Sequence, residues 1–172
     1  MYHTVVIGGG CLGAATAVSL QKKLNKLGKG EKVGLIEKAV LCAAESSRHS
    51  GIVRSANADP DASMMASIST KMWKNIREHW GIDMELDEFG AIWIAKKNSD
   101  GDNPAWTDLS KRMEKINLVF EEIDPDSAIQ KCGTTLITDK DESYFYEPAA
   151  FQLDPSILRS ALYEAIEENG VE

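Results

Sequence analysis

The sequence contains no long apolar run, and this absence argues against a membrane protein. Its longest nearly apolar stretch, Val5 to Ala15, includes four glycines and is much shorter than the ~20 residues that cross a bilayer. Only four residues precede it, without the charged region that opens a secretory signal. We therefore expect a cytoplasmic protein with no transmembrane segment.

Basic clusters and paired cysteines are also missing. Nineteen Lys and Arg residues against 27 Asp and Glu residues give a net charge of −8 and a pI near 5.0. Nucleic acid is not an expected partner, because such binding depends on basic side chains that neutralise phosphates. Cys11, Cys42 and Cys132 are an odd number and include no C-x-x-C pair, so neither a disulfide framework nor a zinc cluster is indicated. Three scattered histidines give no metal-site spacing, and we expect no metal.

With 172 residues, of which 43% are apolar, the chain can form a core of its own. Its first part predicts a strand, a helix and a second strand in succession. The strands are the apolar runs Val5–Ile7 and Val33–Ile36, both expected to be buried. The helix presents one apolar face, formed by Leu12, Ala15, Val18 and Leu24. Such a unit places its strands in parallel, so the sequence predicts an α/β fold of the Rossmann type.

The middle of the chain is less regular. The segment Ala39–Ala58 shows no periodicity and predicts a loop of small and hydroxyl-bearing residues. After it, Asp59 and Pro60 are the expected N-cap and first position of a helix. The apolar stripe of that helix, which we expect in the core, consists of Met65, Ile68, Met72, Ile76 and Trp80.

Further elements are predicted toward the C-terminus. They are strands at 89–95 and 119–123 and a helix at 106–116. Asp124-Pro125 and Asp154-Pro155 each join a capping acceptor to a proline, which is the pattern of a helix start. The last helix ends at Asn169-Gly170, so Val171-Glu172 would begin another strand where the sequence stops. We expect the chain to be truncated within a larger folded unit.

A glycine motif lies between the first predicted strand and the first predicted helix. The residues GGGCLG, which begin at Gly8, fit the pattern G-x-G-x-x-G of dinucleotide-binding domains. Gly8 permits a tight turn, Gly10 lets the backbone approach a pyrophosphate, and Gly13 allows the helix to pack closely on the strand. The N–H groups of the first helical turn, including those of Cys11 and Leu12, and the positive end of the helix dipole would hold the pyrophosphate.

An acidic residue follows at the expected distance. Glu37 ends the second strand 24 residues after Gly13, close to the ~20 residues at which an acid accepts hydrogen bonds from a ribose. In nicotinamide-binding domains the chain usually continues into another crossover helix. Here it enters the segment 43–54, whose small residues, hydroxyls and Arg48 can line an extended ligand. This pattern favours a flavin dinucleotide, FAD, with a nicotinamide-dependent dehydrogenase as the alternative.

Several segments together resemble the N-terminal half of the FAD-dependent D-amino acid oxidase superfamily. They are Val5–Gly10, Leu35–Lys38, Ser46–Arg54 and Phe145–Pro155, the last being similar to the point at which this family re-enters its FAD domain. Similar members are glycine oxidases, sarcosine oxidases and dehydrogenases of the β-subunit type, and proline or 2-hydroxyglutarate dehydrogenases. Because members are more than twice as long, the resemblance implies either a fragment or a subunit that a partner chain completes.

The resemblance also implies a division of the chain. Residues 1–82 would belong to the FAD domain, 83–147 to part of an α+β substrate domain, and 148–172 to the return into the FAD domain. The residues implied around FAD are Gly8, Gly10, Cys11, Leu12, Gly13, Glu37, Lys38, Ser46, Ser47, Arg48, Ser50 and Gly51. Among these, Glu37 would bind the adenosine ribose, and Ser50 and Gly51 would approach the isoalloxazine ring.

Two residues are implied for the catalytic site. Arg54 corresponds by position to an arginine that binds the substrate carboxylate in sarcosine-oxidase-like members, and His49 is the second candidate. The alternative for Arg54 is a surface arginine at a strand end. The expected reaction removes a hydride from the carbon beside the amine of a small amino acid or secondary amine. A 2-hydroxy acid dehydrogenase and a non-catalytic dinucleotide-binding subunit are the alternatives, and the chain by itself is expected to be inactive.

Overall fold

A computed structural model gives the fold of the chain and describes residues 1–57, 59–133 and 136–172. The chain forms two compact units. Residues 1–51, 72–86 and 153–172 make up the first unit, and residues 52–71 and 87–152 make up the second. The boundary predicted at 82/83 placed 52–71 with the first part of the chain, whereas the structure places it in the second unit. The functional division into an FAD domain and a substrate domain stays a prediction.

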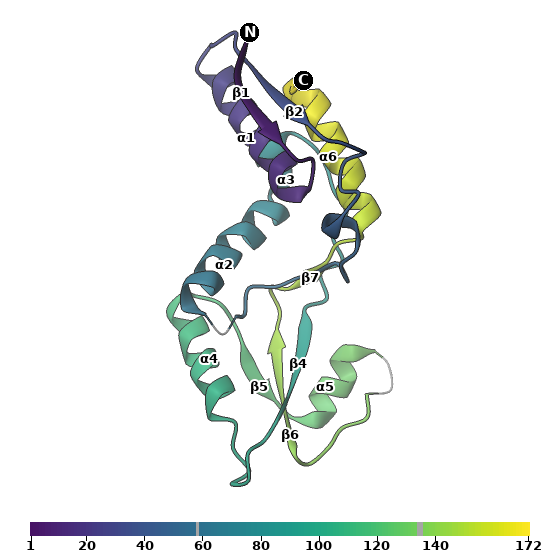
Figure 1. Ribbon diagram of the computed structural model, residues 1–172. Coiled ribbons are helices and arrows are strands. Elements are labelled where there is room, and N and C mark those ends of the chain that lie inside the picture. The colour runs from purple at the N-terminus through teal and green to yellow at the C-terminus, as the bar shows by residue number, and fades with distance from the viewer. Residues whose placement is uncertain (58, 134–135) are drawn as a thin grey trace. The chain divides into compact units, whose positions relative to one another are not determined.

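The first unit contains a parallel strand pair and the helices that pack on it. Its elements are β1 (Tyr2–Ile7), α1 (Cys11–Lys26), β2 (Lys32–Ile36), the 3-10 helix η1 (Glu45–Ser47), α3 (Ile76–Trp80) and α6 (Pro155–Asn169). β1 and β2 run parallel, with Val6 opposite Leu35 and Ile7 opposite Ile36. α1 packs on both strands and against α6 (Figure 1). The predicted strand–helix–strand unit is therefore confirmed.

Burial in this unit differs from the expectation at two places. Val5 and Ile7 are 44% and 84% exposed, because they point away from the face of β1 on which α1 lies. In α1 the buried residues are Ala14, Ala17, Val18, Gln21 and Leu24. Leu12 is 85% exposed, since two positions along a helix correspond to a rotation of about 200° from Ala14. The prediction that Leu12 faces the core was wrong, and a buried glutamine takes a place on that face.

Gln21 joins α1 to the start of β2. Its Oε1 accepts a hydrogen bond from the Val33 N–H at 2.7 Å, and its Nε2 donates to the Glu31 carbonyl at 3.2 Å. Gln21→Leu should lower the free energy of unfolding by about 1–3 kcal/mol, because the buried Val33 N–H loses its acceptor. Urea unfolding followed by circular dichroism measures this change. Gln130→Leu, at an exposed helical position, is the matched control and should unfold at the wild-type midpoint.

The C-terminal residues lie beside β2. The Leu35 N–H donates to the Glu172 carbonyl at 2.6 Å, and the Glu172 N–H donates to the Val33 carbonyl at 3.0 Å. α6 ends at Gly170, whose φ of +73° is the left-handed conformation of a helix terminus. Main-chain pairing of Glu172 with β2 agrees with the expectation that another strand begins here.

The second unit contains an antiparallel sheet. Its elements are β3 (Ile52–Val53), α2 (Pro60–Lys74, with its last residues in the first unit), β4 (Ala91–Lys96), α4 (Pro104–Lys115), β5 (Glu121–Ile123), α5 (Pro125–Cys132), β6 (Glu142–Glu147) and β7 (Phe151–Gln152). The sheet has the order β4-β6-β5, and β3 pairs with β7. α4 and α5 lie on opposite sides of the sheet (Figure 1). Together with the parallel pair of the first unit, this confirms the predicted mixed α/β class.

The core of the second unit is aromatic. Phe145 of β6 stacks on Phe120 with ring centroids 5.3 Å apart, and Trp106 of α4 stacks on both rings. Leu109 and Met113 of α4 complete this side of the sheet. Tyr146, the next residue of β6, points to the opposite side, where Lys131 of α5 covers its ring.

The predicted helix starts are confirmed. The carboxylates of Asp59, Asp124 and Asp154 each accept a hydrogen bond from a main-chain N–H two or three residues later, at distances of 3.0 Å or less. The predicted loop 39–58 contains η1 and β3, and its last residue lies outside the described residues. Prolines at the first helical positions accompany all three caps.

The inward face of α2 was predicted wrongly. Met65, Ile68 and Met72 are 71%, 54% and 40% exposed. The buried residues are the hydroxyl-bearing Ser63, Ser67 and Thr70. Each buried hydroxyl has a hydrogen-bond partner. Ser63 exchanges hydrogen bonds with the main chain of Asn57, Ser67 donates to the Met64 carbonyl at 2.8 Å, and the Thr70 hydroxyl lies 3.2 Å from that of Ser55. Ile76 and Trp80 are buried as expected, but in the separate helix α3.

Candidate functional site

The glycine motif forms a corner between β1 and α1 where backbone conformation or close packing favours glycine. Gly8 has a φ of +106°, in the region that favours glycine. A Cβ atom on Gly13 would lie 1.9 Å from the Gly8 carbonyl oxygen, so the helix is pressed directly against the end of the strand. A Cβ atom on Gly10 would lie 3.2 Å from the Ser46 hydroxyl. The corner therefore exposes main chain where other residues would place side chains.

The first turn of α1 offers N–H groups to an anion. Gly10 is the N-cap and has no capping side chain, and the first turn contains no acidic residue. The Cys11 N–H donates to the Ser46 hydroxyl oxygen at 2.9 Å, while the N–H groups of Leu12 and Gly13 have no acceptor within the helix by position. Because the Ser46 oxygen accepts, its own proton is available for a ligand oxygen. These donors suit a phosphate group.

Glu37 ties the end of β2 to the same corner. Its Oε2 accepts from the Gly9 N–H at 2.7 Å, and its Oε1 accepts from the Ala39 N–H at 3.0 Å. These donated hydrogen bonds, first that of Gly9, hold the pKa of the Glu37 carboxyl below its ordinary value. Each oxygen retains a lone pair, so a ribose hydroxyl can still donate to Glu37.

Substitution of Glu37 tests the contribution of these two hydrogen bonds to stability. Glu37→Gln leaves an amide nitrogen facing one of the two donors, so we expect a lower thermal midpoint at pH 7. Because the folded-state pKa is lowered, the stabilisation is complete above the unfolded pKa of about 4.5 and is lost as the pH falls through the folded value. The difference in midpoint between the two proteins should therefore shrink below pH 4.5. A constant difference down to pH 3 would contradict the proposed hydrogen bonding.

The other residues predicted around FAD lie in the segment that follows β2. Ser46 is half-buried at the corner, whereas Lys38, Ser47, Arg48 and Ser50 are exposed. Ser47 donates its hydroxyl to the Ala44 carbonyl at 3.1 Å. The structure thus brings Glu37 and Ser46 into contact with the glycine motif and leaves the remaining side chains open to solvent.

His49 makes a local contact within this segment. Its Nδ1 accepts a hydrogen bond from the Gly51 N–H at 2.9 Å, which requires Nδ1 to be unprotonated. Gly51 is buried with a φ of +77°, and its carbonyl accepts from the Leu153 N–H at 2.9 Å. His49 therefore shapes the turn at Gly51, and its catalytic role stays a prediction.

Two thiols lie near the glycine corner. Cys42 is buried, has a φ of +58°, and donates its N–H to the Gly9 carbonyl at 2.9 Å. Burial raises the pKa of both the Cys11 and the Cys42 thiol. Both are thus protonated at neutral pH, which disfavours thiolate chemistry at this place.

Arg54 belongs to the second unit, where its side chain is exposed. The guanidinium carbon lies 4.5 Å from the centroid of the Trp93 ring, and Nη1 donates to the Ala56 carbonyl at 2.9 Å. Beside it lies Glu147, a fully buried carboxylate that the sequence analysis did not single out. The sequence pattern that could have indicated Glu147 is an acidic residue at an inward-facing position of a strand, directly after Phe145 and Tyr146 and before Pro148.

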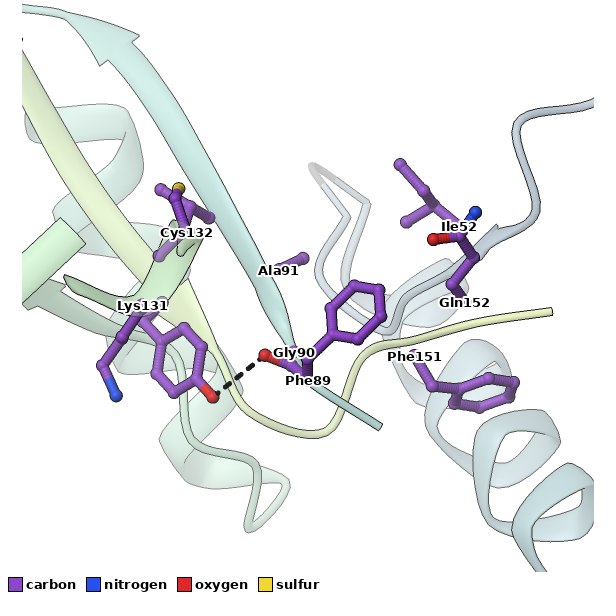
Figure 2. A pocket seen from close by; sticks show the side chains of 10 residues that line it. Ile52, Phe89, Gly90, Ala91, Lys131, Cys132, Phe151 and Gln152 are labelled. Atoms are coloured by element: carbon purple, nitrogen blue, oxygen red, sulfur yellow. Dashed lines mark hydrogen bonds between the residues drawn. The ribbon is translucent and has the colours of Figure 1, made fainter. Parts of the chain in front are cut away.

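The second unit also has a cavity of about 570 Å³ between β4, α5 and the β3–β7 pair (Figure 2). Its lining is mostly apolar and includes Ile52, Phe89 and Phe151. The Tyr146 hydroxyl donates to the Phe89 carbonyl at 3.4 Å, and the Lys131 ammonium lies 3.9 Å from the centroid of the Tyr146 ring. The cavity suits an apolar group and none of the predicted site residues lines it.

Comparison with known proteins identifies the family. A family model described as DAO, FAD dependent oxidoreductase, matches residues 3–172. The chain belongs to this family of FAD-dependent oxidoreductases. The resemblance inferred from the glycine motif and the segment after it is thereby confirmed. Among curated proteins, none matches this chain significantly.

Solved structures share the fold of this chain. L-proline dehydrogenase from P. horikoshii has a TM-score of 0.80 at 20% identity, over 99% of this chain and 43% of its own. Glycine oxidase from Geobacillus kaustophilus has a TM-score of 0.74 at 21% identity, over 99% of this chain and 45% of its own. L-amino acid deaminase from Proteus vulgaris has a TM-score of 0.79 at 20% identity, over 100% and 39%. The chain thus spans less than half the length of these proteins.

Two further findings concern the part of the chain that the structure describes. Within residues 1–57, 59–133 and 136–172, no group of three or more His, Cys, Asp or Glu side chains is arranged to hold a metal ion. None of the helices there combines the length and the apolar character that crossing a bilayer requires.

Proposed function

We propose that this chain contributes the dinucleotide-binding corner of an oxidoreductase that oxidises a small amino acid or secondary amine with FAD as the hydride acceptor. The observation that supports it most is the glycine corner, where the Gly13 Cβ position lies 1.9 Å from the Gly8 oxygen. Family membership supports FAD as the dinucleotide. Relatives named for proline, glycine and L-amino acids support the substrate class.

The residues present fit an FAD pyrophosphate. The N–H groups of Leu12 and Gly13 and the Ser46 hydroxyl would donate to it, and Glu37 would accept from the adenosine ribose. Lys38 and Arg48 would supply positive charge along the exposed segment, the Ser47 oxygen can accept a hydrogen bond, and Ser50 and Gly51 would follow toward the flavin ring. When bound, FAD supplies the acceptor for a hydride, which carries two electrons and one proton. The protein's contribution is to hold the cofactor and to orient the substrate.

Arg54 is the proposed carboxylate-binding residue. Its guanidinium is exposed and rests on Trp93, and Nη1 makes one hydrogen bond to the Ala56 carbonyl. The other N–H groups can therefore form charge-assisted hydrogen bonds to a substrate carboxylate. A 2-hydroxy acid carries the same carboxylate and is the second candidate substrate class, because Arg54 selects for the acid and not for the neighbouring amine.

The experiment uses the full-length protein that contains this chain. Flavin absorbance in the purified protein, and its bleaching under anaerobic conditions by glycine, sarcosine or proline, are the expected results. Bleaching by a 2-hydroxy acid alone would favour the second candidate. A colourless protein that binds NADH would support a nicotinamide enzyme, and a flavoprotein that none of these compounds reduces would support a non-catalytic subunit.

A further inference from the structure

Glu147 is a buried carboxylate in the second unit that the proposed reaction does not use directly. It ends β6 and has no exposed surface. Its Oε1 accepts hydrogen bonds from the N–H groups of Ser55 and Ala56, the latter at 3.1 Å, and its Oε2 accepts from Trp93 Nε1 at 3.1 Å. Three N–H donors compensate for the loss of hydration that burial of a carboxylate entails.

All three donors lie next to Arg54, two in the sequence and one in space. Ser55 and Ala56 are the next two residues of the chain, so Glu147 fixes the main chain at which the Arg54 side chain begins. The Ala56 carbonyl in turn accepts from Arg54 Nη1 at 2.9 Å. Trp93, the third donor, lies against the guanidinium, 4.5 Å from its carbon to the ring centroid. The carboxylate thus holds both the main chain next to Arg54 and the ring on which its guanidinium rests.

The Trp93 ring is contacted by two aromatic side chains in addition to the Glu147 carboxylate. Trp93 contacts Trp106 at a centroid distance of 5.5 Å and an interplanar angle of 60°, and Phe120 at 5.9 Å and 76°. Its strand position places it diagonally across from Glu147 on the same side of the sheet, since Ala91 is the direct partner of Glu147. The ring contacts and the hydrogen bond to Glu147 together restrict rotation of the indole ring.

Glu147 forms no ion pair with Arg54. Within residues 1–57, 59–133 and 136–172, Arg54 forms no ion pair with a carboxylate. The negative charge of Glu147 is instead directed to neutral N–H groups. The positive charge of Arg54 consequently remains available for a ligand carboxylate, while the positions of its main chain and of the ring beneath it are fixed.

We propose that Glu147 is a positioning residue that, through the Ser55 and Ala56 N–H groups and the Trp93 indole, holds the Arg54 guanidinium ready for the substrate carboxylate. This inference rests on the proposed function of Arg54. The guanidinium then loses its conformational entropy during folding and not during binding. Substrate binding is therefore tighter than it would be to a mobile arginine.

Glu147→Gln removes one link of this arrangement with little change in size. An amide oxygen can accept from the two main-chain N–H groups, but the amide NH₂ then faces the Trp93 N–H, donor against donor. We expect the dissociation constant for acetate, a probe for the carboxylate alone, to rise about tenfold. Calorimetric titration of the full-length, FAD-containing protein measures it, and the dissociation constant for methylammonium, which lacks a carboxylate, should not change.

The control and the double variant separate positioning from general damage. Glu122→Gln, at an exposed position of the same sheet, should leave acetate binding unchanged. In an Arg54→Met background, Glu147→Gln should have no further effect on the dissociation constant, because there is no guanidinium left to position. A further loss in that background would overturn the proposal, since Glu147 would then act on the fold and not through Arg54.

The remaining outcomes distinguish the two hypotheses. If Arg54→Met weakens acetate binding and Glu147→Gln does not, the positioning role is wrong and the proposed role of Arg54 stands. If Arg54→Met has no effect, the proposed role of Arg54 fails and the positioning role fails with it. If Glu147→Gln does not fold, Trp93→Phe replaces it, because it keeps a ring and removes the N–H; unchanged acetate binding would then overturn the proposal.

Discussion

Gly13→Ala should abolish FAD retention and lower the free energy of unfolding by about 3 kcal/mol or more. The added methyl group would lie 1.9 Å from the Gly8 carbonyl oxygen and 3.1 Å from its carbon. Both are main-chain atoms, so relief requires that α1 move away from β1, and the N–H groups of the first turn move with it. Flavin absorbance per protein, together with denaturant unfolding, measures the two effects in the full-length protein.

Gly30→Ala is the matched control for this prediction. Gly30 lies in the same strand–helix–strand unit, a Cβ atom there meets nothing within 4 Å, and its φ is outside the left-handed region. Its free energy of unfolding should therefore stay within about 1 kcal/mol of wild type, with full flavin content. Equal flavin loss in both variants would mean that the close approach of α1 to β1 is not what the cofactor requires.

Arg54→Met should reduce kcat/KM for a carboxylate-bearing amine by about 100-fold or more. Methionine retains an apolar stem that can rest on Trp93, but it cannot donate hydrogen bonds or supply charge. The loss should appear mainly in KM, because the arginine binds the carboxylate and does not take part in bond breaking. Anaerobic flavin reduction at varied substrate concentration separates binding from the rate of reduction.

Arg77→Met serves as the control for charge and side-chain type. The Arg77 side chain is 78% exposed and pairs with Asp83 at 3.3 Å on the surface of the first unit. Exposed ion pairs of this kind contribute little to stability. Because Arg77 has no proposed contact with the substrate, the kinetic constants of Arg77→Met should equal those of wild type. If the two arginine variants behaved alike, Arg54 would be the surface arginine at a strand end that the sequence left as an alternative.

Local sequence was sufficient to predict the first strand–helix–strand unit, the three helix starts and the glycine corner. The parallel β1–β2 pair, the helix that begins after Gly10, and the aspartate caps at Asp59, Asp124 and Asp154 depend on contacts between residues close in the chain or on one recurring motif. The family resemblance followed from the same segments. These features are determined by backbone conformation and hydrogen bonding that particular residues require at particular positions.

Contacts between residues far apart in the sequence determined which faces of the helices are buried. The inward face of α2 carries Ser63, Ser67 and Thr70 because hydroxyl partners such as Ser55 and main-chain groups of Asn57 meet it there, whereas periodicity alone favoured the methionines. Leu12 was misplaced for the same reason, since the sheet selects which face of α1 is covered.

The sequence by itself determined that a helix starts at a glycine corner suited to a pyrophosphate and that Arg54 follows it at a fixed distance along the chain. Only the tertiary structure decided what surrounds that arginine. Glu147 and Trp93 are 93 and 39 residues away from it in the sequence. Their contacts exist because β4 and β6 pair in one register and bring both side chains to the same side of the sheet, a relation that no local pattern encodes.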